Sequence, residues 1–168
     1  MSEERTHPFV TYLQEHAEDR AVLAELRRGL GREPGEAAGM FPYVVPFVHD
    51  RYQEADLYLI ASLFALHPAS VSSGNMGTHL HAYAHAVGDD AATTRRFVQL
   101  LNLRRPSLDS PLRQHISMLK SKDIPINWHR LIYDLRYWEH TDRFVQKQWA
   151  SAYWPPKSNG KTKQSKSS

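Results

Sequence analysis

The stretch "TTRRFVQLLNLRRP" (93–106) places two pairs of arginines on either side of an apolar run. At about 100° per residue, the apolar residues of 97–101 fall in one sector, which predicts an amphipathic helix. Asp89 or Asp90 is expected to cap its start. We expect the helix to end near Leu103, because the residue before a proline disfavours helical geometry. The second arginine pair then follows the helix end, where the helix no longer directs its side chains.

Helical periodicity extends outward from this stretch, and no run shows a sustained alternation with period two. Residues 54–66 predict a buried helix. Asn127 is a good N-cap for a helix that turns Trp138 inward, and Thr78 is expected to cap a helix through Val87 in the same way. These patterns predict an all-α fold.

The bulk composition narrows the class of protein. The chain has 168 residues, which fits one compact domain or two small subdomains, and it has no cysteine, which excludes disulfides and thiolate chemistry. The acidic N-terminus "MSEERTHPF" (1–9) lacks the apolar segment of a secretory signal. No apolar run approaches the ~20 residues of a membrane span. We therefore expect a soluble, cytoplasmic protein without a membrane partner.

Charge is distributed unevenly along the chain. Residues 1–94 carry 6 Lys and Arg against 13 Asp and Glu, a net charge of −7, whereas residues 95–156 carry 11 against 5, a net charge of +6. Residues 157–168 add 4 lysines and no acid. This asymmetry indicates an anionic partner, or docking against a second copy or a neighbouring protein. The polar, lysine-rich tail of 155–168 is typical of disorder.

Three histidines have a spacing that metal sites use. His81 and His85 lie one helical turn apart, with His79 nearby, as zinc ligands often do. Because no HExxH motif and no clear carboxylate ligand accompany them, polar or half-buried histidines on a helix face are the stronger interpretation. The sequence therefore favours a protein that needs neither a metal nor another cofactor.

Catalytic motifs are equally sparse. The chain contains no GxSxG, GxGxxG or GxxxxGK[ST] motif. Carboxylates such as Asp134 and Glu139 are expected to be solvated, or paired with arginines at helical spacing, rather than to carry acid–base chemistry. We therefore expect that the protein is not an enzyme.

Basic residues are the remaining functional signal. Arginine suits bidentate contact with phosphate better than lysine does, and several of these residues follow helix ends, where they can converge. The competing interpretation is a solvated helix surface, on which each charge near a helix C-terminus contributes only ~0.3–1 kcal/mol. Spacing alone does not decide between the two. The residues concerned are Arg95, Arg96, Arg104, Arg105, Arg113, Lys120, Lys122, Arg130, Arg136 and Arg143.

Four segments together resemble a known family. They are "ELRRGL" (25–30), "FPYVVPF" (41–47), "RRFVQLLNLRR" (95–105) and "PINWHRLIYDLRYW" (125–138). In this order and at these distances they resemble the CasB-type small subunit of the type I-E CRISPR surveillance complex, Cascade. The resemblance covers about residues 8–150.

The resemblance implies a fold and a set of partners. The expected fold is all-α, with two small packed helical bundles, 1–94 and 95–154, in one compact chain, followed by the disordered tail of 155–168. The expected protein is a non-catalytic subunit that binds other Cascade subunits and pairs head-to-tail with a second copy of itself within the complex.

By the same resemblance, a basic surface lies along the guide RNA–target region, holds the displaced single-stranded DNA and stabilises the R-loop. The alternative is a helical protein–protein adaptor without direct nucleic-acid contact. The residues expected to bind nucleic acid are Arg27, Arg28, Arg95, Arg96, Arg104, Arg105, Arg113, Lys120, Lys122, Arg130 and Arg136.

Overall fold

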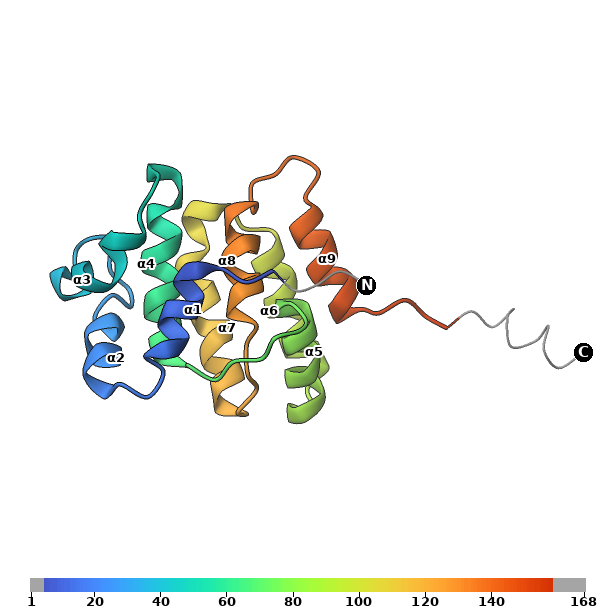
Figure 1. Ribbon diagram of the computed structural model, residues 1–168. Coiled ribbons are helices and arrows are strands. Elements are labelled where there is room, and N and C mark those ends of the chain that lie inside the picture. Colours follow the sequence, from blue (N-terminus) through green and yellow to red (C-terminus); the bar gives the residue numbers. More distant parts are fainter. Residues whose placement is uncertain (1–4, 159–168) are drawn as a thin grey trace, which may run out of the picture.

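The structure is a computed structural model that describes residues 5–158 (Figure 1). In that range the chain forms α-helices, loops and three short 3₁₀ segments, and it contains no β-strand. The all-α prediction is confirmed. The helices are α1 (Pro8–Glu15), α2 (Arg20–Arg27), α3 (Phe41–Val44), α4 (Arg51–Leu66), α5 (Met76–Val87), α6 (Asp90–Leu101), α7 (Asp109–Ser121), α8 (Trp128–Arg136) and α9 (Phe144–Tyr153), and the 3₁₀ segments are Ala38–Met40, Val45–Phe47 and Arg105–Ser107.

Helix α4 lies at the centre of the fold. Every residue from Asp56 to Ala65 is buried, which is the pattern of a helix enclosed on all sides. Helices α2, α7 and α8 pack directly on α4, and α1 packs on both α4 and α8. Figure 1 shows α4 between α2 on one side and the α7–α8 pair on the other.

Helices α5, α6 and α9 form the end of the molecule away from α2 (Figure 1). Helix α5 packs against both α9 and α6. Gly77 of α5 permits this close approach, because a Cβ at this position would collide with the backbone carbonyl of Trp149 in α9. The glycine is therefore required by the packing of the two helices rather than by an unusual backbone angle.

The buried apolar side chains form one continuous core, whose largest members include Trp128, Trp138 and Trp149. This core draws on residues from both 1–94 and 95–154. The α4–α8 and α5–α9 contacts also cross the expected boundary. The division into two bundles stays a prediction.

Helix caps follow local side-chain chemistry. Asn127 and Asp89 cap α8 and α6 as predicted, and each side-chain oxygen accepts a hydrogen bond from the N–H three residues further on, at 3.2 and 3.3 Å. The predicted cap for α5 is wrong, because Asn75 rather than Thr78 is the N-cap residue. Thr78 is the third residue of the helix and completes a capping box with Asn75.

None of the helices within residues 5–158 combines the length and apolar character needed to cross a membrane. Of the tail predicted to be disordered, residues 155–158 are exposed and lie outside any helix. The rest of that tail, 159–168, is outside the described residues.

Candidate nucleic-acid interface

Arg105 lies in a buried ionic cluster. Its Nε and Nη2 donate to Asp56 Oδ1 at 2.9 and 2.6 Å, and its Nη1 donates to Asp109 Oδ1 at 2.6 Å. Its side chain is only 18% exposed. Burial raises the pKa of the Asp56 carboxyl, and the guanidinium opposes that rise. The guanidinium is thus committed to carboxylates, so the expectation that Arg105 faces nucleic acid does not fit its position.

Arg104 differs from its neighbour because its side chain is 81% exposed. Helix α6 ends at Leu101, earlier than the predicted Leu103, and Arg104 is extended before the next 3₁₀ segment. Its Nη1 donates to Glu139 Oε1 at 2.9 Å. The Arg105 backbone N–H and the Arg104 guanidinium hold the pKa of Glu139 below its usual range. An exposed pair of this kind contributes ~0–1 kcal/mol, so Arg104 can exchange this partner for a phosphate.

Arg95 and Arg96 are both exposed on α6, Arg95 on the side away from the buried Phe97 and Leu100 and Arg96 at the border of that buried face. Neither arginine has a hydrogen bond or an ion pair with another residue of 5–158. The amphipathic helix predicted from the opening stretch is confirmed. Burial lowers the pKa of His115 and the charge of Arg96 lowers it further, so Arg96 lies near the buried face. Both guanidinium groups keep their N–H donors for a ligand.

The C-terminal end of α2 carries Arg27 and Arg28, both exposed. Arg27 Nη1 donates to the backbone carbonyl of Ala65 at 3.2 Å, which ties α2 to the end of α4. Arg28 Nε lies 3.3 Å from Glu25 Oε1 in an exposed pair one helical turn apart. Both guanidinium groups keep donors for another partner, since each has five N–H groups.

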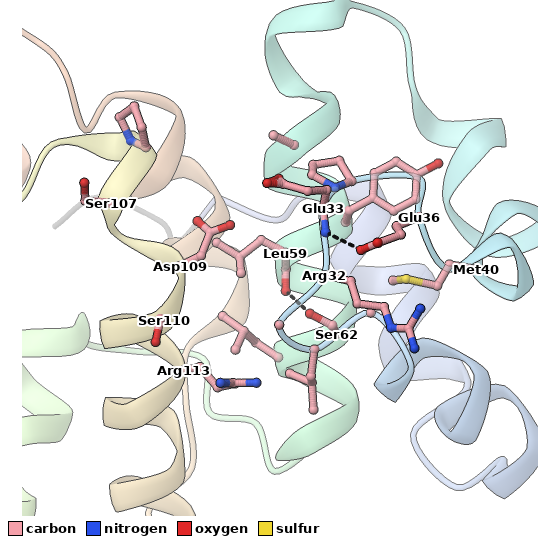
Figure 2. Close-up of a pocket in the computed structure, with 18 residues that line it drawn as sticks. Arg32, Glu33, Glu36, Met40, Leu59, Ser62, Ser107, Asp109, Ser110 and Arg113 are labelled. Atoms are coloured by element: carbon pink, nitrogen blue, oxygen red, sulfur yellow. Dashed lines mark hydrogen bonds between the residues drawn. The ribbon is translucent and has the colours of Figure 1, made fainter.

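Arg113 lines a cleft of about 380 Å³ between the loop 29–36, α4 and the start of α7 (Figure 2). Its half-buried side chain extends from α7 toward α4, and no hydrogen bond or ion pair joins it to the described part of the chain. The guanidinium passes over Gly31, whose φ is +75°, and a Cβ there would lie 3.0 Å from Nη1. Arg32 of the same cleft points away from α7 (Figure 2).

Lys120 and Lys122 are exposed at the C-terminal end of α7. A cation at this position complements the partial negative charge of the helix terminus. They present two charges to solvent at the turn where the chain runs from α7 toward α8.

The two predicted arginines of helix α8, Arg130 and Arg136, have different environments. Arg130 Nε donates to the buried Asp134 at 3.0 Å, and its Nη2 donates to Gln148 at 2.7 Å. Burial raises the pKa of Asp134, which Trp149 Nε1 also contacts, at 2.7 Å. Arg130 therefore serves the α8–α9 packing. Arg136 is exposed at the end of α8.

Sequence reasoning did not identify the aromatic side chains that accompany the basic residues after α8. The rings of Tyr137 and His140 both contact Phe144, with ring centroids 5.9 Å apart for Tyr137–Phe144 and 5.0 Å apart for His140–Phe144. Arg136 lies over the Tyr137 ring, 5.7 Å from its centroid. The signal was present in 133–144 as several aromatic residues interspersed with charged ones.

The histidines expected on one helix face have separate structural partners. His79 is buried, and its Nε2 accepts a hydrogen bond from the Asn127 N–H at 3.0 Å. Burial lowers the pKa of His79 to about 4. His81 Nδ1 contacts the Tyr153 carbonyl at 3.0 Å. Residues 5–158 contain no group of three His, Asp or Glu side chains placed to hold a metal ion.

The basic residues do not gather at one point. The elements that carry them extend from α2 at one end of the molecule, through α7 and α8, to α6 at the other end (Figure 1). Arg105 and Arg130 are committed to buried carboxylates, whereas the other predicted residues keep donors for a partner. The arrangement is that of a distributed basic surface rather than a compact pocket.

Comparison with known proteins gives a consistent set of matches. Residues 22–154 match the family model described as CRISPR-associated protein Cse2. A CRISPR-associated protein Cse2 from Thermus thermophilus is 32% identical over 138 residues, which are 80% of this chain and 79% of that protein.

Solved structures match over most of the chain as well. The structure of CasB from M. ruber is 28% identical with a TM-score of 0.72, over 95% of both chains. A chain in a structure of a CRISPR RNA-guided surveillance complex is 26% identical with a TM-score of 0.74, over 87% of this chain and 89% of that one.

Proposed function

The chain belongs to the Cse2 family of CRISPR-associated proteins, and we propose that it is the non-catalytic small subunit of a CRISPR RNA-guided surveillance complex in the cytoplasm. Its similarity to a chain of such a complex supports this role. Its partners would be the other subunits of the complex, a second copy of itself, the guide RNA and the displaced single-stranded DNA.

The observation that carries the proposal is the pair Arg95 and Arg96. Both side chains are exposed on a helix whose opposite face is in the core, and neither has an ionic partner within the described residues. Exposed arginines whose N–H donors are not used within the fold are suited to bidentate phosphate contact. The mechanism is positioning: base pairing with the guide reads the sequence, and the protein supplies a positive surface for the backbone.

The surface we propose for backbone contact excludes the two arginines held by buried carboxylates. Arg105 and Arg130 position other elements of the fold and reach nucleic acid only at the cost of unpaired buried carboxylates. The residues that remain are Arg27, Arg28, Arg95, Arg96, Arg104, Arg113, Lys120, Lys122 and Arg136. Contacts of this kind would stabilise the R-loop without base specificity.

The test is co-expression of the chain with the other subunits of its complex and a guide RNA, followed by native mass spectrometry and photo-crosslinking to bound target DNA. We expect co-purification, two copies per complex, and crosslinks from the α6 surface to nucleic acid. Assembly without any such crosslink would instead identify the chain as a protein–protein adaptor. Failure to co-purify would overturn the assignment to the complex.

A further inference from the structure

An aromatic edge follows helix α8 and leads into α9. We use this name for Tyr137, His140 and Phe144, in which the rings of Tyr137 and His140 both contact the ring of Phe144. Tyr137 is 38% exposed and the His140 side chain is 48% exposed, whereas Phe144 is partly buried against the core. Exposed aromatic rings in contact with one another offer flat apolar faces to a planar ligand.

Three arginines surround the aromatic edge. Arg136 lies over the Tyr137 ring, and Arg104 is exposed beside Glu139. Arg143 is also exposed, and its Nη2 donates to the Leu101 carbonyl at 2.6 Å. These charges favour an anionic planar ligand over an apolar protein surface.

Arg143 has an unusual backbone conformation, which fixes where its side chain leaves the chain. Its φ is +57°, in the left-handed region that non-glycine residues rarely adopt. Such a conformation costs on the order of 1 kcal/mol and persists when the surrounding structure requires it. Here it turns the chain into α9, and the carbonyl contact directs the guanidinium toward the end of α6.

The carboxylates near the edge already have partners. Glu139 accepts from the Arg104 guanidinium and the Arg105 backbone N–H. Asp142 accepts from the Phe144 backbone N–H at 3.0 Å and lies 2.9 Å from His140 Nδ1. Their charges are therefore partly satisfied within the fold, and repulsion of an anionic ligand is reduced.

We infer that this edge binds unpaired bases of single-stranded nucleic acid, which stack on Tyr137 while Arg104 and Arg143 contact the adjacent phosphates. The inference rests on the proposed function and adds a stacking contribution to the backbone contacts. A duplex does not fit this chemistry, because its bases are stacked on one another and present no free face. Base–aromatic stacking is tolerant of sequence, since every base has a π-face.

The experiment measures binding of the full-length chain to a fluorescein-labelled deoxythymidine oligomer of about 15 nucleotides by fluorescence anisotropy over a range of salt concentrations. Tyr137→Leu removes the ring and keeps an apolar side chain. We expect it to weaken binding about fivefold or more and to leave the salt dependence unchanged. The matched control is Tyr52→Leu, because Tyr52 is 93% exposed on α4, and this variant is expected to bind like the parent.

Two further measurements separate stacking from charge. Arg104→Gln should reduce the log–log salt slope by about 0.7, the contribution of one contact with single-stranded phosphate. An oligomer with abasic sites should bind the parent more weakly than the intact oligomer does. The affinity of Tyr137→Leu should differ little between the two oligomers. Melting curves of each variant verify the fold.

The inference is overturned if Tyr137→Leu binds the oligomer as tightly as Tyr52→Leu does. It is also overturned if Tyr137→Leu, relative to the parent, loses as much affinity for the abasic oligomer as for the intact one. Failure of the parent to bind the oligomer at low salt would overturn it as well. None of these results would affect co-purification with the complex or crosslinking from α6. Loss of those crosslinks with stacking retained would instead overturn the proposed function alone.

Discussion

Arg105 and Asp56 form a buried ion pair across 49 positions of sequence, with the guanidinium Nη2 2.6 Å from the carboxylate Oδ1. Their side chains are 18% and 11% exposed. The pair links the 3₁₀ segment after α6 to the central helix α4, and Asp109 at the start of α7 joins it. Arg105 therefore fixes the path of the chain between α6 and α7.

Replacing Arg105 with Gln should destabilise the protein. It leaves the Asp56 carboxylate buried without its cation, and removal of one partner from a buried pair costs about 3–5 kcal/mol. For a chain of this size that corresponds to a fall in melting temperature of roughly 6–20 °C. The measurement is thermal unfolding by circular dichroism.

Arg104→Gln is the matched control for this prediction, since the neighbouring arginine is exposed and its pair with Glu139 is on the surface. It should melt within about 2 °C of the parent. If Arg105→Gln has the same melting temperature as Arg104→Gln, the Arg105–Asp56 ion pair does not stabilise the fold. The sequence alone favoured a different expectation, that Arg104 and Arg105 both bind nucleic acid.

This difference shows which features sequence reasoning can reach. The caps at Asn127 and Asp89 were predictable, because a cap and its N–H partner lie three residues apart. The helix at 93–101 was predictable from its apolar period. The partner of Arg105 was not, because no local pattern identifies a carboxylate 49 positions away.

Two other features have the same limit. Thr78 and Asn75 both have capping side chains, and only the backbone conformation shows that Asn75 lies outside the helix. The aromatic edge was visible as composition, but the contact of Tyr137 with Phe144 depends on the turn between α8 and α9. Residue spacing thus predicted the helices and the exposed charges. Ion pairs between residues far apart in the sequence decided which arginines keep donors for nucleic acid.

Gly77→Ala should destabilise the α5–α9 contact. The added Cβ would collide with the Trp149 carbonyl, so the helices must move apart, at a cost of about 1–3 kcal/mol or more. Gly88→Ala is the control, because Gly88 has φ of +72° but no atom within 4 Å of an added Cβ. Its cost is limited to backbone strain on the order of 1 kcal/mol.

Chemical denaturation of both variants measures this difference. We expect the midpoint of Gly77→Ala to fall below that of Gly88→Ala. Equal midpoints would mean that α5 and α9 adjust to the methyl group, and that close packing at Gly77 is not needed for stability.

Acid should weaken the fold through His79. Burial lowers the folded-state pKa to about 4 from 6.5, and the neutral Nε2 accepts the Asn127 N–H. The unfolded chain therefore binds the proton more readily. The stabilisation is complete above pH 6.5 and is lost as pH falls toward 4, by on the order of 3 kcal/mol.

The variant His79→Asn isolates this contribution, since its side-chain carbonyl can accept the same N–H but does not titrate. Comparison with the parent also cancels the lowered pKa values of His7, His115 and His129 and the raised values of the buried aspartates. Denaturant unfolding at several pH values should show a shallower acid dependence for His79→Asn. Parallel curves would contradict the assignment.

Truncation after Pro156 should leave the melting temperature nearly unchanged. The removed segment, "KSNGKTKQSKSS" (157–168), contains no apolar residue to bury, and its first two residues are exposed. Differential scanning fluorimetry of the full-length and truncated chains is sufficient. A loss of several degrees would show that the tail docks on the folded part.

The central claim is that exposed arginines on α6 hold nucleic acid within the assembled complex. The direct measurement is the affinity of the reconstituted complex for the displaced strand as a function of salt, with Arg95→Gln/Arg96→Gln compared with Arg20→Gln/Arg51→Gln. The control pair removes the same charge from exposed residues at the start of α2 and α4. We predict weaker binding and a salt slope lower by about 1.4 for the α6 variant only. Equal affinity and equal slope for the two variants would contradict the account.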